Sequence, residues 1–130
     1  MSKVHITLVG GQPAPVYHGI VATQPDYVFY VCSQSRDSRR AQNILKKVLK
    51  KMPCGWYSLH PTDPVTIKSF AESLAERFKD DEVTVNISGG LKSWSHWFGI
   101  VFDKYPNASV VYMDQNNVLW NYRTMESSSG

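Results

Sequence analysis

One stretch of the sequence combines a strand, a glycine turn and a lysine in an order that suits anion binding. In residues 82–98, EVTVNISGGLKSWSHWF, apolar and polar residues first alternate, and helical spacing resumes after Lys92. Between them, Ser88, Gly89 and Gly90 predict a tight turn whose free N–H groups lead into a helix. Lys92 has the wrong sign for the positive end of a helix dipole, which a nearby phosphate would explain. An ordinary turn with a solvent-exposed lysine is the alternative.

The same stretch departs from the two best-known phosphate-binding motifs. A P-loop has glycine directly before its lysine, whereas Leu91 stands there. The dinucleotide motif G-x-G-x-x-G is absent here and also after Val9. The sequence therefore indicates neither a P-loop ATPase nor an NAD enzyme, and we expect no cofactor and no metal site.

The elements that position this stretch alternate between strand and helix. The patterns predict strands at 4–9, 27–32, 56–59, 83–87, 108–113 and 118–122, and helices at 15–22, 37–51, 65–79 and 93–105. This order predicts an α/β fold, a Rossmann-like three-layer α/β/α sandwich with a mostly parallel six-stranded sheet and a C-terminal antiparallel hairpin strand. We expect one domain at 1–124 and a disordered polar tail at 125–130.

Two glycine turns are expected to meet in this fold. The commonest arrangement places the first and fourth strands side by side at the sheet centre, where ligands bind outside the carboxyl ends of the strands. The predicted ligand-binding residues follow four of the strands: Gly10, Gly11, Gln12, Pro13, Ser33, Gln34, Ser88, Gly89, Gly90, Leu91, Lys92, Asp114 and Gln115. Such a crevice predicts a phosphate-bearing ligand, most simply a nucleotide.

Composition limits the class of protein. The chain has 130 residues, 42% of them hydrophobic, and no apolar run near the ~20 residues that a membrane helix needs. A soluble globular domain with no membrane segment is expected. Cys32 and Cys54 lack metal-ligand spacing and are predicted to be reduced thiols, which favours the cytoplasm. A net charge of +3 is too small to indicate binding of long nucleic acid.

The predicted helix at 37–51 has an apolar side and a basic side. Its apolar residues Ala41, Ile44, Leu45 and Val48 follow helical spacing. The basic side carries Arg39, Arg40, Lys46, Lys47, Lys50 and Lys51. Because no aromatic residues are interleaved with these charges, we expect a solvated surface; a nucleic-acid patch is the alternative.

The last predicted helix carries an aromatic stripe. At helical spacing it places Trp94, Trp97, Phe98, Val101 and Phe102 on one side. Such a stripe is more often part of the core, or the seam of a dimer, than a platform for stacking bases. We therefore expect it to belong to the core or to a dimer seam.

Three features together resemble a known family. They are the segment NISGGLK at 86–92, the glycine turn after the first strand, and the closing hairpin at 110–122. They resemble the CARF domain, the CRISPR-associated Rossmann fold of type III CRISPR accessory proteins. The resemblance covers the whole chain in architecture, and its specific part is N-I-[ST]-G-G-x-K. Members commonly have threonine before the lysine, where this chain has Leu91.

The resemblance implies a homodimer that binds one cyclic oligoadenylate, with cyclic tetra-adenylate favoured, between two facing crevices. Main-chain N–H groups and Lys92 would contact phosphates. Gln12, Gln34 or Gln115 would bond adenine or ribose, and Asn86 would tie down the glycine loop from beneath. In this family the domain usually switches an effector, often a nuclease, and no effector is recognisable in this chain.

The sequence leaves a binding module and an enzyme open. A sensor would bind the ring intact. A metal-independent ring nuclease would let a ribose 2′-hydroxyl attack its adjacent phosphate, with Lys92 stabilising the charge and Ser88 orienting the oxygens. His18 is the one histidine that we would test for acid–base chemistry. Another mononucleotide-binding α/β domain is the remaining alternative.

Overall fold

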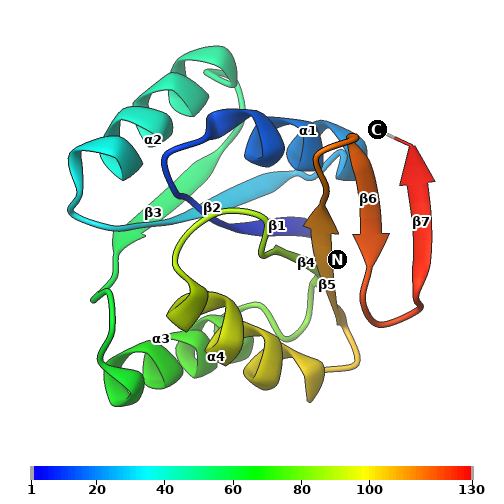
Figure 1. Cartoon of the computed structure of the whole chain (residues 1–130). Helices are drawn as coiled ribbons and strands as arrows, with labels where there is room; N and C mark the ends of the chain where they lie inside the picture. Colours follow the sequence, from blue (N-terminus) through cyan, green and yellow to red (C-terminus); the bar gives the residue numbers. More distant parts are fainter. Residues whose placement is uncertain (1, 130) are drawn as a thin grey trace.

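The protein has three layers, seen in a computed structural model that describes residues 2–129 (Figure 1). Helices α1 (Pro13–Thr23) and α2 (Arg36–Val48) cover one face of a central sheet, and α3 (Pro64–Arg77) and α4 (Lys92–Asp103) cover the other. The strands are β1 (Lys3–Leu8), β2 (Tyr27–Cys32), β3 (Cys54–Ser58), β4 (Glu82–Asn86), β5 (Ala108–Met113), β6 (Val118–Asn121) and β7 (Glu126–Ser129). The predicted α/β sandwich is confirmed.

The sheet has the order β3-β2-β1-β4-β5-β6-β7. The first five strands in this order are parallel, and β6 and β7 are antiparallel additions at one edge. The predicted adjacency of the first and fourth strands is confirmed, with Thr7 opposite Asn86. The chain therefore reverses its winding between β1 and β4, which is where a doubly wound sheet offers a crevice.

Two hydrophobic layers hold the helices to the sheet. On the α3 and α4 side, Ile6, Leu8 and Val85 pack with the aromatic stripe of α4. Trp94, Phe98 and other members of that stripe are buried, so the stripe belongs to the core, as expected. A second layer lies beneath α1 and α2 and includes the buried thiol of Cys32.

A seventh strand corrects the prediction of six strands and a disordered tail. Residues 126–129 form β7, which pairs with β6 through Trp120 opposite Ser127. Met125 adopts a left-handed conformation in the turn, at φ 64°, and Asn121 Oδ1 accepts the N–H groups of Arg123 and Thr124. This strand is held by backbone pairing, so the polar sequence ESSS carries no alternation that would have predicted it. Gly130 lies outside the described residues.

Helix α2 is shorter and less buried than predicted. It ends at Val48, and of its apolar stripe only Ala41 and Leu45 are buried. Ile44 and Val48 are exposed by 39% and 58%. Because β3 is the edge strand, α2 reaches the core only with the side that faces β2 and α1.

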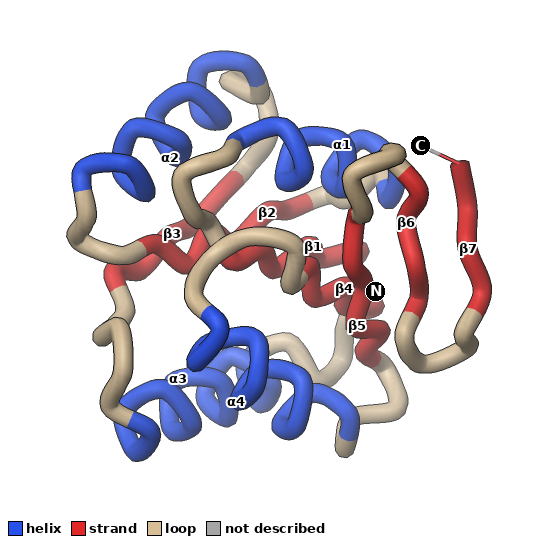
Figure 2. Tube along the Cα trace, viewed as in Figure 1, coloured by secondary structure: helices blue, strands red, loops and turns tan. Residues whose placement is uncertain are grey.

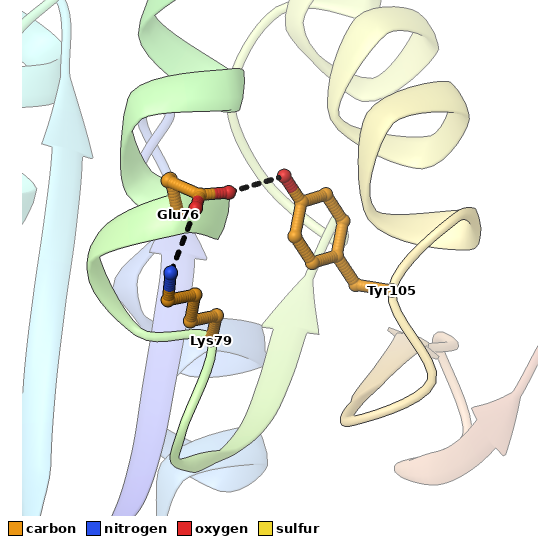
Figure 3. Close-up of polar contacts among 3 residues, drawn as sticks. All are labelled: Glu76, Lys79 and Tyr105. Atoms are coloured by element: carbon orange, nitrogen blue, oxygen red, sulfur yellow. Dashed lines mark hydrogen bonds and ion pairs between the residues drawn. The ribbon is translucent and has the colours of Figure 1, made fainter.

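Exposed polar contacts tie α3 to the loop before β5, as Figure 3 shows. The Glu76 carboxylate accepts from Lys79 Nζ and from the Tyr105 hydroxyl, both at 3.1 Å. The Lys79 hydrogen bond, followed by that of Tyr105, lowers the pKa of Glu76. These contacts lie next to the start of β5, whereas the glycine turns follow the ends of β1 and β4.

Within residues 2–129, no helix is both long and apolar enough to cross a membrane.

Candidate functional site

The two glycine turns are in direct backbone contact. A Cβ added at Gly10 would lie 3.0 Å from the Gly90 nitrogen, and one added at Gly89 would lie 2.6 Å from the Leu8 carbonyl oxygen. Gly90 has a φ of 77°, a conformation that glycine adopts without strain. The loops after β1 and β4 therefore meet at the carboxyl ends of the central strands (Figure 2).

Asn86 and Ser88 brace the second turn from below. The side chain of Asn86 is fully buried, and its Oδ1 accepts from the Ser88 hydroxyl and, at 2.9 Å, from the Ser88 N–H. The Ser88 Oγ in turn accepts the Met113 N–H at 2.6 Å. Asn86 thus holds the loop as the sequence predicted. Ser88 joins β4 to the end of β5, and its hydroxyl is engaged inside the protein.

The start of α4 is rich in free hydrogen-bond donors. Leu91 precedes the helix in an extended conformation and provides no side-chain cap. Within the described residues, the backbone N–H groups of residues 89–93 have no acceptor. Lys92, at the first helical position, is exposed. It forms no ion pair among the residues that the structure describes. Free N–H groups, the helix dipole and an ammonium group therefore share one small region, which suits an anion.

Two of the other helices that start at this edge are capped by side chains. The Ser35 hydroxyl caps α2 by accepting the Ser38 N–H, and the Asp63 carboxylate caps α3 by accepting the Val65 N–H. Helix α1 has no side-chain cap, but Pro13 and Pro15 supply no N–H in its first turn. The N–H groups of Gly10, Gly11 and Gln12 likewise have no acceptor among the described residues, so both glycine turns offer donors, and Lys92 adds a charge to the second turn.

A groove of about 600 Å³ lies beside this donor region. Its lining consists of Ser33, Gln34, Ser35, Tyr57, Ser58, Leu59, His60, Pro61, Thr66 and Leu91. The sequence predicted Ser33, Gln34 and Leu91 but missed the residues from the end of β3 onward. Parallel strands end at the same edge of a sheet, and this rule placed the other predicted residues. The same rule would have included the segment from the end of β3 onward.

Two groove residues have fixed orientations. The Tyr57 ring stacks on Phe70 at a centroid distance of 4.4 Å and an interplanar angle of 19°. The His60 Nδ1 accepts the N–H groups of Thr62 and Asp63 at 3.1 and 3.0 Å. A neutral His60 then carries its proton on Nε2 and can donate it. The groove thus offers an aromatic wall and a donor that local contacts hold in place.

Several predicted site residues serve the fold instead of an open surface. The Ser33 hydroxyl donates to the Ser35 Oγ at 2.8 Å. Asp114 accepts the Trp120 indole N–H at 3.0 Å and the backbone N–H groups of Asn116 and Val118. These hydrogen bonds, chiefly that of Trp120, lower the pKa of Asp114.

The predicted glutamines, in contrast, remain available to a ligand. Gln12, Gln34 and Gln115 are exposed, with no side-chain hydrogen bond among the described residues.

A buried polar layer lies beneath α1. His5 Nδ1 lies 2.9 Å from the Thr23 Oγ1, whose hydrogen goes to the carbonyls of Gly19 and Ile20, so that Nδ1 is the donor. Burial lowers the pKa of His5 to about 3, and the ring is neutral near pH 7. His18, the acid–base candidate, lies within α1, edge-on to Tyr17 at 5.6 Å. Neither ring belongs to the two glycine turns.

Comparisons with known proteins agree with this architecture. The family model described as the Card1 CARF domain matches residues 4–129. A search of the curated proteins gave no match.

Several solved structures share the fold. Can2 from Sulfobacillus thermosulfidooxidans, solved with cyclic tetra-adenylate, is 16% identical with a TM-score of 0.83. Protein VC1899 from Vibrio cholerae is 17% identical with a TM-score of 0.80. A type III CRISPR defence DNA nuclease activated by cyclic oligoadenylate is 16% identical with a TM-score of 0.76. The matches cover 98%, 98% and 99% of this chain but 36%, 35% and 21% of those chains. At these identities the likeness establishes the fold.

Proposed function

The chain belongs to the Card1 CARF domain family, and we propose that it senses a cyclic oligoadenylate in type III CRISPR antiviral signalling, with cyclic tetra-adenylate favoured. The observation that carries the proposal is the run of N–H groups at 89–93 beside the free Lys92. Support also comes from two structural neighbours, of which one was solved with cyclic tetra-adenylate and another is activated by cyclic oligoadenylate.

Each crevice would bind a phosphate and a base in adjacent places. The N–H groups of residues 89–93 and the Lys92 ammonium group would hold the phosphate. The adjoining groove is large enough for a base, and Tyr57 presents an aromatic wall to it. Gln34 and His60 would bond the edge of an adenine or a ribose hydroxyl, because an amide and an Nε2–H offer the required donors and acceptors.

A homodimer would complete the site. A two-fold axis presents the same crevice twice, which matches a ring of four identical nucleotides. Each protomer would then contact half of the ring, and ligand binding would favour a closed form of the dimer. An effector domain outside this chain would respond to that closure, in keeping with the small share of the neighbouring proteins that the chain spans.

Binding without cleavage is the favoured activity. The Ser88 hydroxyl donates to Asn86 and accepts from Met113, so it is already engaged and poorly placed to orient a reacting phosphate. A metal-independent ring nuclease is the second candidate, supported by the free Lys92 charge that would stabilise a transition state in which the 2′-hydroxyl attacks phosphorus. Another mononucleotide would be the ligand if neither ring binds.

Calorimetry with cyclic tetra- and hexa-adenylate tests the proposal, combined with chromatography of the ligand over hours in the presence of chelator. We expect tight binding of the intact tetra-adenylate ring at one ring per two chains. Linear products would identify a ring nuclease at the same site. Failure to bind either ring, with folded protein verified by circular dichroism, would contradict cyclic oligoadenylate recognition altogether.

A further inference from the structure

The outer surface of α2 concentrates positive charge. Half of the 14 lysines and arginines of the chain lie in residues 36–51, where Asp37 is the one acidic residue. Among the described residues the one ion pair is Lys79–Glu76, so none of these cations is neutralised by a carboxylate in contact. A shallow groove of about 410 Å³ runs along the helix, lined by Arg36, Arg39, Arg40, Asn43, Ile44 and Lys47.

The fold places an aromatic residue beside these charges, which the sequence alone does not. Trp56 lies on β3 and is 55% exposed. Lys46 of α2 lies over its ring, with Nζ 5.3 Å from the ring centroid. Trp56 pairs in register with Tyr30, which belongs to the hydrophobic layer beneath α1 and α2, so the indole lies on the α2 side of the sheet. The sequence interleaves no aromatic residue with these cations, but the fold places Trp56 beside them.

We propose that this surface, the α2 basic face, binds single-stranded nucleic acid. We define it as Arg36, Arg39, Arg40, Lys46, Lys47, Lys50, Lys51 and Trp56. Its cations would follow the phosphates along a helix about 20 Å long, and the exposed indole would stack with an unpaired base. A duplex is a poorer partner because its bases are already stacked and paired. The proposal is independent of the proposed function, because Lys92 and the free donors belong to the crevice and not to α2.

Fluorescence anisotropy with labelled oligouridylate RNA and oligothymidylate DNA of about 12 nucleotides tests the proposal. The charge variant Arg39→Glu/Lys47→Glu is compared with Lys68→Glu/Lys104→Glu, which changes net charge equally on other surfaces. Trp56→Ala is compared with Trp120→Ala, a tryptophan at the opposite end of the sheet that is also exposed. A duplex of the same length and anionic lipid vesicles serve as competing ligands.

We expect the α2 charge variant to weaken single-strand binding more than tenfold and Trp56→Ala to weaken it about fivefold or more, with less than twofold change in either control. Comparison of RNA with DNA identifies the kind of strand. Equal weakening by both charge variants would reduce the effect to net charge and overturn the proposal. Duplex binding as tight as single-strand binding, or binding to vesicles alone, would also overturn it. Unchanged affinity for cyclic tetra-adenylate in the α2 variants would separate this surface from the crevice.

Discussion

The turn after β1 and the turn after β4 touch at the centre of the sheet, but they differ in what they offer a ligand. The turn at 88–92 leads into α4 with free N–H groups and a lysine. The turn at 10–12 leads into α1, where Pro13 and Pro15 remove two donors. Among the described residues, both turns keep N–H groups without an acceptor, and the second turn adds the lysine. Neighbouring loops of one crevice can thus share hydrogen bonding and differ in charge.

The largest expected effect is steric and separates Gly89 in the second turn from Gly11 in the first. We expect Gly89→Ala to lower the free energy of unfolding by about 3 kcal/mol, because the new Cβ would lie 2.6 Å from the Leu8 carbonyl oxygen. Gly11→Ala should change it by less than about 0.5 kcal/mol, since its Cβ would meet only the Asp37 Cβ at 3.4 Å. Urea denaturation of both variants makes the measurement. Equal costs would mean that these two glycine positions are packed alike.

The buried polar groups of β1 and β4 should respond differently to pH. His5 lies beneath α1, and its folded pKa of about 3 is below the ordinary value of 6.5. Between these values the unfolded chain binds more protons than the folded chain. The contribution of neutral His5 to stability is therefore complete above pH 6.5 and is lost as pH falls toward 3. We expect the free energy of unfolding to drop by about 2 kcal/mol from pH 7 to 5.

Urea denaturation at the two pH values tests this expectation. The His5→Gln variant should lose most of the drop, whereas the exposed His96→Gln should retain it. The brace beneath the second turn, Asn86 with Ser88, does not titrate in this range. A drop that persists unchanged in His5→Gln would assign the pH dependence to other groups.

The charge at the second turn should act on the ligand and not on the fold. We expect Lys92→Ala to weaken cyclic tetra-adenylate binding by about 1.5 kcal/mol, close to tenfold. The exposed Lys92 forms no ion pair among the described residues, so its removal leaves no partner unsatisfied there. Lys104→Ala, which removes a lysine from the other end of α4, is the matched control. Calorimetry measures both affinities. Equal losses would indicate a general charge effect in place of a phosphate contact.

The sequence could predict the layers and the central crevice because local signals encode them. Apolar alternation and glycine turns gave the strands, and their order placed β1 beside β4. Strand β7 escaped because its side chains do not alternate and its stability comes from backbone pairing with β6. Ile44 and Val48 have the spacing of core residues, but their exposure depends on where α2 lies over the sheet edge.

The candidate site was less predictable because a polar side chain can serve a ligand or its own backbone. Ser88 and Asp114 follow strands, as binding residues often do, yet Ser88 accepts a bond from Met113 and Asp114 accepts one from Trp120. The first of these bonds joins residues far apart in the sequence, and no local pattern encodes it. Tyr57 of the groove depends similarly on its stacking with Phe70.

The smallest expected effect concerns the proline-rich start of α1. Pro15→Ala would restore one backbone N–H to the first turn of that helix. If the phosphates bind at α4, where Lys92 lies, the added N–H should change cyclic tetra-adenylate affinity by less than about 0.3 kcal/mol, a fraction of one hydrogen bond. Calorimetry beside Lys92→Ala makes the comparison direct. A clear gain in affinity would place a phosphate at α1 as well, and the charge of Lys92 would then not be what decides where phosphate binds.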